Sequence, residues 1–551
     1  MKTRFFAIAL LLVAATNISA KTRSLQQIKT EAMKVLNGTA AKGMKKVRSA
    51  ADLSVLMEKP QLTILTSTTG SVVVANDDAF APILGYTDAP MGDNIAPAFL
   101  WWVETANQSL ENMLASGMEP VKVKPNAAYR SAVNELLTCR WGQDAPFNNI
   151  CPEYTDKGQK QRYVTGCVAT AMSQILYYHK YPITGEGKYS YRFNPGDGAV
   201  LTLKAEFGKT TYDWDNMLDV YTEGKYNEAQ AQAVATLMSH CGISVKMNYN
   251  KDGSGAYPVD ATLALRKYFR CNKYAKMYMR NFMPNEEWMN IIYRELNDNC
   301  PVLYGGTSAS VGGHAFVLDG YNEDGLVHVN WGWDGKENGF FDIASLNGYT
   351  SGQTLTQVRP ATDTRYESVY KSIWGTETNL TLDKVGESAV STGNVVMYNL
   401  DVEDFTGTVA FVATNMSTGN VKILSTFLSK SEVVESTHGF QAESIDISLS
   451  SLGTGKYRLY FASKGATETS WQPVRSHESV CNCYIVSITN GKITSLVPEE
   501  SSNWTGIQNI NVSTTKPNNT RVYSIDGRVM GNDINAMGKG LYIVDGKKVM
   551  K

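Results

Sequence analysis

The sequence predicts an α+β fold followed by all-β structure. Between residues 126 and about 360, helix-spaced apolar runs come first, and strand-like runs such as Pro301-Val-Leu-Tyr and Leu326-Val-His-Val-Asn follow them. Helices that precede antiparallel strands suit an α+β fold with a cleft between two lobes. Beyond about residue 363, short alternating strands are separated by Thr, Ser and Gly turns, which is typical of a β-sandwich.

The N-terminus has the three parts of a secretory signal peptide. Met-Lys-Thr-Arg is cationic, an apolar run begins at Phe5, and Ile18-Ser-Ala offers small residues for cleavage. The apolar run is too short to span a bilayer, and no other run reaches the ~18 residues that a span needs. We therefore expect residues 1–20 to be a signal peptide, and the protein to be secreted without a transmembrane segment.

Composition excludes some classes of partner. The chain has 551 residues, 43% of them apolar, and this length predicts about three domains. Its 52 Lys and Arg residues stand against 53 Asp and Glu residues. The near-zero net charge gives no field that would attract nucleic acid or an anionic membrane, so we expect no nucleic-acid partner.

The eight cysteines carry no decisive pairing signal. The pair in Cys481-Asn-Cys483 has zinc binding as an alternative, but no second such pair and no histidine cluster accompanies it. Buried, inert thiols are the interpretation we favour. We expect neither a metal nor an organic cofactor.

Residues 21–122 predict a small region of mixed structure. Ser24–Leu36 has helix spacing, and Ser24 can cap it. Pro97–Gly117 predicts a second helix. Between the two helices, strand-like or turn-like runs begin at Leu62, Ser71 and Phe80.

The following region predicts four helices and then four strands. The first helix, Cys167–His179, has an apolar side and ends shortly before Pro182. The later helices are expected at Tyr226–Cys241, Pro258–Tyr268 and Pro284–Asn297. The strands are expected at Pro301-Val-Leu-Tyr, His314-Ala-Phe-Val-Leu, Leu326-Val-His-Val-Asn and Gly339-Phe-Phe-Asp-Ile.

Cys167 is the predicted nucleophile. It lies between a turn glycine and an apolar helix in Val164-Thr-Gly-Cys-Val-Ala-Thr-Ala. A thiol at a helix N-terminus feels the partial positive charge of unpaired amides, which lowers its pKa and favours the reactive thiolate. A lone cysteine is more often a buried apolar residue, so this prediction depends on the motifs downstream.

His314 and Asn330 are the predicted partners of that thiol. His314 follows two glycines in Val311-Gly-Gly-His-Ala-Phe-Val, and Asn330 stands in His328-Val-Asn-Trp-Gly-Trp. An antiparallel hairpin with its turn at Asn322-Glu-Asp-Gly would bring both side chains together. The amide oxygen could then hold the imidazole in the tautomer that a general base needs.

Other assignments of the base and the nucleophile are weaker. His328 lies on the same strand as Asn330, but it lacks a glycine approach for substrate, so we interpret it as an ordinary strand residue. A serine nucleophile is disfavoured because the sequence has no Gly-x-Ser-x-Gly elbow.

These three motifs, in this order, resemble the streptopain family of papain-like cysteine peptidases, which bacteria secrete as zymogens. The resemblance covers about residues 25–360. It implies a papain-like two-lobed catalytic domain, with Cys167 as nucleophile, His314 as general base and acid, and Asn330 as the orienting amide. It also implies that Trp331 shields the catalytic pair and that Ser254 and Gly313 touch substrate.

Papain-like enzymes usually take one oxyanion donor from a glutamine before the nucleophile. Gln161 has the expected offset, and Gln159 is a nearby alternative because the loop could shift by one residue. Gln161 is the residue that we predict.

The same resemblance assigns the N-terminal region. It implies that residues 21–122 are an inhibitory propeptide, with Asp77-Asp-Ala-Phe-Ala-Pro-Ile-Leu-Gly-Tyr as its characteristic segment. A small independent domain is the alternative. The proline-rich stretch Glu119-Pro-Val-Lys-Val-Lys-Pro is the expected activating cut, and residues 123–362 would then form the catalytic domain.

The C-terminal part divides into residues 363–500, the predicted β-sandwich, and residues 501–551. The last segment resembles the sorting domain of proteins exported by the Bacteroidetes type IX route, in Thr520-Arg-Val-Tyr-Ser-Ile-Asp-Gly and Gly540-Leu-Tyr-Ile-Val-Asp-Gly. This implies attachment at the outer cell surface or removal of the tail. A final pair of β-hairpins is the alternative.

We therefore expect a secreted cysteine endopeptidase that is made as a zymogen and cleaves peptide bonds through a thioester. Its partners would be protein or peptide substrates and its own propeptide. The resemblance implies an apolar preference two residues before the scissile bond. The alternatives are a surface adhesin with a vestigial peptidase domain, or amide hydrolysis or acyl transfer on other substrates.

Overall fold

The structure is a computed structural model in which two compact units are distinguished. It describes residues 21–39, 47, 49–117, 123–195, 199–251, 253–308, 311–346, 352–363, 365 and 372–499, and the backbone of four short strands after residue 521. The first unit contains the described residues up to Gly92 and those from Leu110 to Gly117. The second contains Asp93–Ser109 and the described residues from Val123 onward.

The first unit packs a helix on an antiparallel sheet. Helix α1 (Leu25–Thr39) starts with a capping box, because the Ser24 hydroxyl accepts from Gln27 N and the Gln27 side chain accepts from Ser24 N. Ile28 and Leu36 of α1 meet Val72 of the sheet in one apolar cluster. The sheet strands are β1 (Ser54–Glu58), β2 (Leu62–Thr66), β3 (Ser71–Ala75) and β4 (Ile83–Thr87). The predicted mixed structure is confirmed here.

Helix α2 (Pro97–Ser116) is divided between the two compact units. Its residues up to Ser109 group with the second unit. Aromatic packing is the physical reason, because Phe99 contacts Trp331 and Phe341 with ring centroids 5.7 and 5.5 Å apart. Trp102 also donates its Nε1–H to the carbonyl of Asp342 at 3.0 Å.

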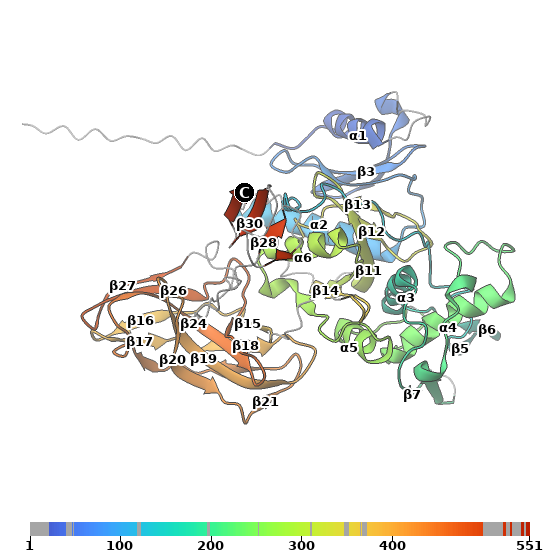
Figure 1. Ribbon diagram of the computed structural model, residues 1–551. Helices are drawn as coiled ribbons and strands as arrows, with labels where there is room; N and C mark the ends of the chain where they lie inside the picture. The colour runs from blue at the N-terminus through green and yellow to red at the C-terminus, as the bar shows by residue number, and fades with distance from the viewer. Residues whose placement is uncertain are drawn as a thin grey trace, which may run out of the picture. The chain divides into compact units, whose positions relative to one another are not determined.

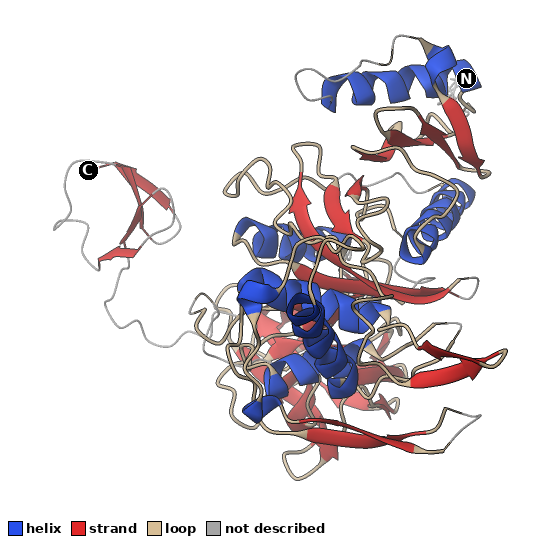
Figure 2. Ribbon diagram, turned by 90° about the vertical axis from the view of Figure 1, so that its right-hand side faces the viewer, coloured by secondary structure: helices blue, strands red, loops and turns tan. Residues whose placement is uncertain are grey.

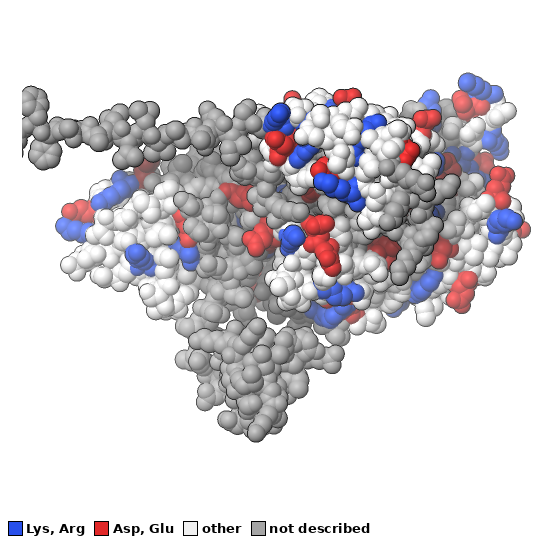
Figure 3. Space-filling view, turned by 90° about the horizontal axis from the view of Figure 1, so that it is seen from above, with Lys and Arg blue, Asp and Glu red and all other residues white. Residues whose placement is uncertain are grey.

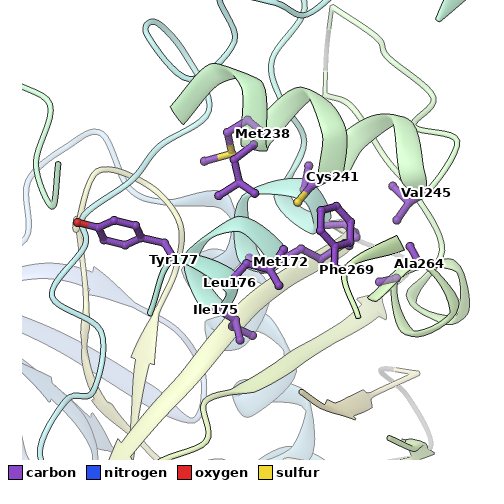
Figure 4. Close-up of a cluster of buried hydrophobic side chains, with 14 of the residues drawn as sticks. Met172, Ile175, Leu176, Tyr177, Met238, Cys241, Val245, Ala264 and Phe269 are labelled. Atoms are coloured by element: carbon purple, nitrogen blue, oxygen red, sulfur yellow. The ribbon is translucent and has the colours of Figure 1, made fainter. Parts of the chain in front are cut away.

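Three helices of the second unit, Cys167–His179, Glu228–Ser244 and Pro258–Tyr268, contribute to one apolar core (Figure 4). Met172 and Leu176 of the first helix face Met238 and Cys241 of the next, and Ile175 belongs to the same core. The predicted apolar side of that helix is thus confirmed. The α-helices are α3 (Cys167–His179), α4 (Glu228–Ser244), α5 (Pro258–Tyr268) and α6 (Asn285–Asn297), and the 3-10 helices are η2 (Phe207–Lys209), η3 (Trp214–Asn216) and η4 (Arg280–Phe282).

The strands of this region form a sheet in the order β13-β12-β11-β10-β14-β9, with α3 beside β11 (Figure 1). The predicted hairpin is confirmed, since β11 and β12 pair antiparallel. The bounds are β9 (Met277–Met279), β10 (Val302–Ser308), β11 (Gly312–Tyr321), β12 (Val327–Asn330), β13 (Gly339–Phe341) and β14 (Thr354–Gln357). Two separate hairpins are β5 (Glu153–Asp156) with β6 (Gln159–Arg162) and β7 (Tyr189–Phe193) with β8 (Leu201–Ala205).

The described residues from 372 to 499 contain strands and no helix (Figure 2). A seven-stranded sheet and two three-stranded sheets share one apolar core, which includes Trp374, Val390 and Phe411. The bounds are β15 (Trp374–Gly375), β16 (Leu382–Val385), β17 (Ala389–Thr392), β18 (Val395–Asn399), β19 (Phe405–Asn415), β20 (Val421–Leu428), β21 (Val433–Val434), β22 (Gly439–Ala442), β23 (Asp446–Ser448), β24 (Gly455–Gly465), β25 (Gln472–Pro473), β26 (Cys483–Thr489) and β27 (Lys492–Pro498). All-β structure in this part of the chain is as predicted.

Both ends of the chain lie largely outside the described residues. The predicted signal peptide falls there, as do most of the expected activation stretch and most of the predicted sorting segment. The tail shows only a four-stranded sheet, with β28 (Val522–Ser524), β29 (Val529–Gly531), β30 (Leu541–Val544) and β31 (Lys547–Met550). None of the described helices is both long and apolar enough to cross a bilayer.

Acidic and basic side chains are intermixed on the face shown in Figure 3, where neither sign forms an extended patch. All eight cysteines are free thiols, and six of them are buried.

Candidate active site

A cavity of about 360 Å³ holds both predicted catalytic residues. We call its two sides the helix wall and the strand wall. The helix wall consists of Cys167, Val168, Asn248, Gly255, Ala256, Tyr257 and Pro258. The strand wall consists of Gly306, Thr307, Gly313, His314, Ala315 and Gly352. The two walls come from stretches of chain that are far apart in sequence, as a two-lobed cleft requires.

Gly166 makes the turn that presents Cys167. Its φ is +87°, a value that favours glycine, and a Cβ there would lie 2.8 Å from the carbonyl oxygen of Ser254. Cys167 is then the first residue of α3, and its side chain is half-buried. The predicted combination of a turn glycine and a helix start is confirmed.

Burial raises the pKa of the Cys167 thiol, and hydrogen bonds from the backbone N–H groups of Ala315, Val168 and Cys167 itself oppose that rise without cancelling it. This corrects the expectation that the helix N-terminus alone would lower the pKa. The contact with Ala315 places the sulfur next to the residue that follows His314.

His314 lies on β11 with its ring half-buried at the cavity. Its Nε2 is 3.2 Å from the carbonyl oxygen of Val311, which can only accept a hydrogen bond, so Nε2 carries a proton. In the neutral ring Nδ1 is then the free acceptor. Burial lowers the pKa of His314, and the bond to Val311 opposes that shift.

Asn330 bonds to partners other than His314 in this structure, so its role as the orienting amide stays a prediction. In the β11–β12 hairpin Asn330 pairs with Val317, three residues beyond His314. Its Oδ1 accepts from Gln174 Nε2 at 3.0 Å and from Gly332 N at 3.1 Å. Both lone pairs of this oxygen are therefore used, and the acceptor for the imidazole is the backbone of Val311.

Of the three residues that the resemblance places around the substrate or over the catalytic pair, only Gly313 lines the cavity. Ser254 is buried and its hydroxyl donates to the carbonyl of Val164 at 2.8 Å, so it ties the loop before Gly255 to the Cys167 turn. Trp331 is 1% exposed, and its Nε1–H donates to the carbonyl of Glu337 at 2.8 Å. Its ring packs on Phe316 with centroids 4.8 Å apart, as part of the core behind the strand wall.

The position of Gln161 does not fit the predicted oxyanion role. Gln161 lies on the exposed strand β6, pairs with Tyr154 of β5 and does not line the cavity. Gln143 does not line the cavity either, but it is half-buried and its backbone carbonyl accepts from the N–H of Thr165, two residues before Cys167. Its signal in the sequence is weak, a Trp141-Gly-Gln run far upstream of the nucleophile.

His328 lies outside the cavity, as the sequence indicated. Its Nδ1 is 2.6 Å from Asp319 Oδ1, and both side chains are buried. Among the described residues, no group of three or more His, Cys, Asp or Glu side chains is arranged to hold a metal ion.

Comparison with known proteins supports the same chemistry. The peptidase C10 family matches residues 141–341, which include Cys167, His314 and Asn330. Streptopain from Streptococcus pyogenes is 35% identical over 300 residues, covering 51% of this chain and 73% of that protein. This chain belongs to the streptopain family of cysteine peptidases.

Two further relatives extend this family assignment. The thiol protease/hemagglutinin PrtT of Porphyromonas gingivalis is 34% identical over 296 residues, but the match spans only 33% of that protein. A solved fragment of prointerpain A from Prevotella intermedia is 39% identical, with a TM-score of 0.51 over 55% of this chain and 97% of that one. The matched part of this chain is therefore similar in fold to that solved fragment.

Proposed function

We propose that the protein is a secreted endopeptidase, made as a zymogen, in which Cys167 and His314 act as a catalytic pair. The observation that carries this proposal is that both residues line one cavity, with the backbone N–H of Ala315 bonded to the sulfur. Asn330 has no direct part in the proposed pair. The prodomain of the solved relative and the helix pattern of residues 21–117 support a zymogen.

The proposed reaction starts when His314 Nδ1 takes the proton of the Cys167 thiol. The thiolate then attacks the carbonyl carbon of the scissile peptide bond, and the imidazolium gives its proton to the leaving amine. Water, deprotonated by His314, hydrolyses the thioester. The backbone N–H of Cys167 and the side chain of Gln143 are the proposed donors to the oxyanion.

The apolar preference two residues before the scissile bond stays a prediction with some structural support. A small apolar cavity shares Val168, Pro258 and Ala315 with the catalytic cavity. Leu303 also lines it, together with the threonines of β14. An apolar side chain would be removed from water there.

The test uses full-length chains with and without Cys167→Ala. We expect the wild type to process itself and then hydrolyse casein, and the variant to accumulate as an unprocessed chain without activity. Normal processing and casein hydrolysis by the variant would remove the proposal.

Binding by the all-β region is the second candidate, because the Porphyromonas gingivalis relative carries the names of both a protease and a hemagglutinin. Outer-surface attachment through the C-terminal segment belongs to the same proposal. Haemagglutination by the Cys167→Ala chain, and its loss after deletion of residues 372–551, would support binding as an independent function. Absence of haemagglutination by the intact chain would exclude it.

A further inference from the structure

The amide side chains of Gln174 and Asn330 form a buried hydrogen bond near the catalytic pair. Gln174 is fully buried on α3 and Asn330 is 1% exposed at the end of β12. Gln174 Nε2 donates to Asn330 Oδ1 at 3.0 Å, and Asn330 Nδ2 donates to the carbonyl of Cys139 at 2.9 Å. Neither side chain lines the cavity, so neither touches substrate.

The bond joins the two elements that carry the reacting atoms. Gln174 is seven residues after Cys167 on α3, which is close to two helical turns, so both side chains face the same direction and lie ~10 Å apart along the helix. Asn330 pairs with Val317, three residues beyond His314, or ~10 Å along the strand. The bond thus lies at similar distances from the nucleophile and the base.

A hydrogen bond of this kind restricts both the distance and the angle between two elements, whereas apolar packing is non-directional. The core of α3 consists of residues such as Met172 and Ile175, whose apolar contacts are non-directional. A hydrogen bond between two amides in a dry environment has a required length and angle. Gly332 allows this approach, since its N–H also donates to Asn330 Oδ1 and a Cβ there would lie 3.2 Å from Thr170 of α3.

We propose that Gln174 and Asn330 are positioning residues for the peptidase reaction, and that their bond sets the separation of the Cys167 sulfur and the His314 ring. This inference rests on the proposed function of that pair. It gives Asn330 a role in the reaction that passes through α3 instead of through the imidazole.

Gln174→Met is the primary test, because methionine has a similar length and cannot donate. The full-length variant is processed by added wild-type enzyme and then separated from it. We expect kcat to fall by about 10- to 100-fold with KM within about twofold, since a displacement near 1 Å is enough to cost that factor. Gln357→Met is the matched control, because Gln357 is also buried and donates to Glu295 at 2.8 Å. We expect this control to lower Tm but not kcat.

Alkylation of Cys167 separates positioning from a general loss of stability. In the processed enzyme the imidazolium should keep part of the sulfur ionised at pH 6, whereas at pH 9 the thiol ionises without it. We expect Gln174→Met to lower the ratio of iodoacetamide rates at pH 6 and pH 9 by about tenfold, in proportion to the predicted effect on kcat. The control variant should keep the wild-type ratio.

A wild-type kcat and a wild-type alkylation ratio in folded Gln174→Met would overturn the inference. If that variant does not fold, Gln174→Asn is used, because it keeps a buried amide but is too short to reach Asn330. The double variant Gln174→Met/Asn330→Leu should be no slower than the slower single variant. A fully additive loss, or a loss confined to Asn330→Leu, would show that Asn330 acts on its own. These outcomes are distinct from failure of the proposed function, in which Cys167→Ala would stay active.

Discussion

The helix wall and the strand wall hold their catalytic atoms by different means. Cys167 is fixed by backbone geometry, because the positive φ of Gly166 and the start of α3 leave its side chain little choice of direction. His314 lies on a strand that pairs along its length with β10, where it faces Gly306. Its ring, however, has one hydrogen bond, to the carbonyl of Val311.

This difference shows that the nucleophile is placed by the fold and the base is placed by a local contact. Helix α3 is closely packed in the core, so any shift of the helix also moves its first residue, Cys167. A ring held by one carbonyl can instead turn about its own side-chain bonds. We expect changes on the helix wall to act through position, and changes on the strand wall to act through ring orientation and proton transfer.

The largest expected loss of activity follows removal of a reacting group from either wall of the cavity. Cys167→Ala and His314→Ala should each lower kcat/KM of the processed enzyme by roughly 10⁴- to 10⁶-fold, and the double variant should be no worse, because the two groups act as a unit. Steady-state hydrolysis of a fluorogenic peptide measures this. A His314→Ala enzyme with more than a tenth of wild-type activity would mean that another residue is the base.

The next largest expected effect is a loss of stability when a ring is removed from the core behind the strand wall. Trp331→Ala removes a buried ring from contact with Phe316 and Phe341, and we expect a loss of about 3–5 kcal/mol in the free energy of unfolding. Trp333→Ala, at a half-buried position, should cost much less. Urea unfolding of both variants makes the comparison. Full stability with lost activity in Trp331→Ala would restore its predicted role as a shield at the site.

The two glutamines test the oxyanion assignment directly. Gln143→Ala should lower kcat by about 10²- to 10³-fold with little change in KM, which is the usual cost of one oxyanion donor. Gln161→Ala should leave kcat unchanged, because its side chain is exposed on β6. Reversal of this order would place Gln161 at the site after a rearrangement of the β5–β6 hairpin.

Much of the fold could be predicted from apolar spacing. The bounds of α3 and of α5 match the predicted helices, because a 3.6-residue period and nearby prolines determine where those helices lie. The hairpin of β11 and β12 was also predictable from its turn. Its register was not, because a shift of a few residues satisfies the same apolar pattern and decides whether Asn330 meets His314 or Val317.

Other parts of the site could not be predicted because backbone groups form them. The carbonyl of Val311 and the N–H of Ala315 hold the base and the sulfur, and any residue type supplies them. The prediction of Gln161 depends on its offset from Cys167. In the structure Gln161 lies on the β5–β6 hairpin, where its side chain is exposed. Gln174 could have been noticed, since its long polar side chain follows Cys167 by two turns on a mostly apolar helix.

A smaller expected effect is the pH dependence of Cys167 alkylation in the full-length chain. Burial raises the pKa of Cys167 and lowers the pKa of His314, so both groups are neutral near pH 7. A raised thiol pKa means that thiolate appears only as pH rises through the alkaline range. We expect iodoacetamide to modify Cys167 slowly in the unprocessed chain at pH 7 and progressively faster above pH 9. Rapid modification at pH 6–7 before processing would show that the pair is already ionised.

The most direct test of the catalytic pair is mass spectrometry of the processed enzyme after treatment with an epoxide inhibitor of cysteine peptidases. The predicted result is one adduct on Cys167, formed with loss of activity, and no adduct in the His314→Ala variant under the same conditions. Complete inhibition with the adduct on another residue, and with Cys167 unmodified, would contradict the account.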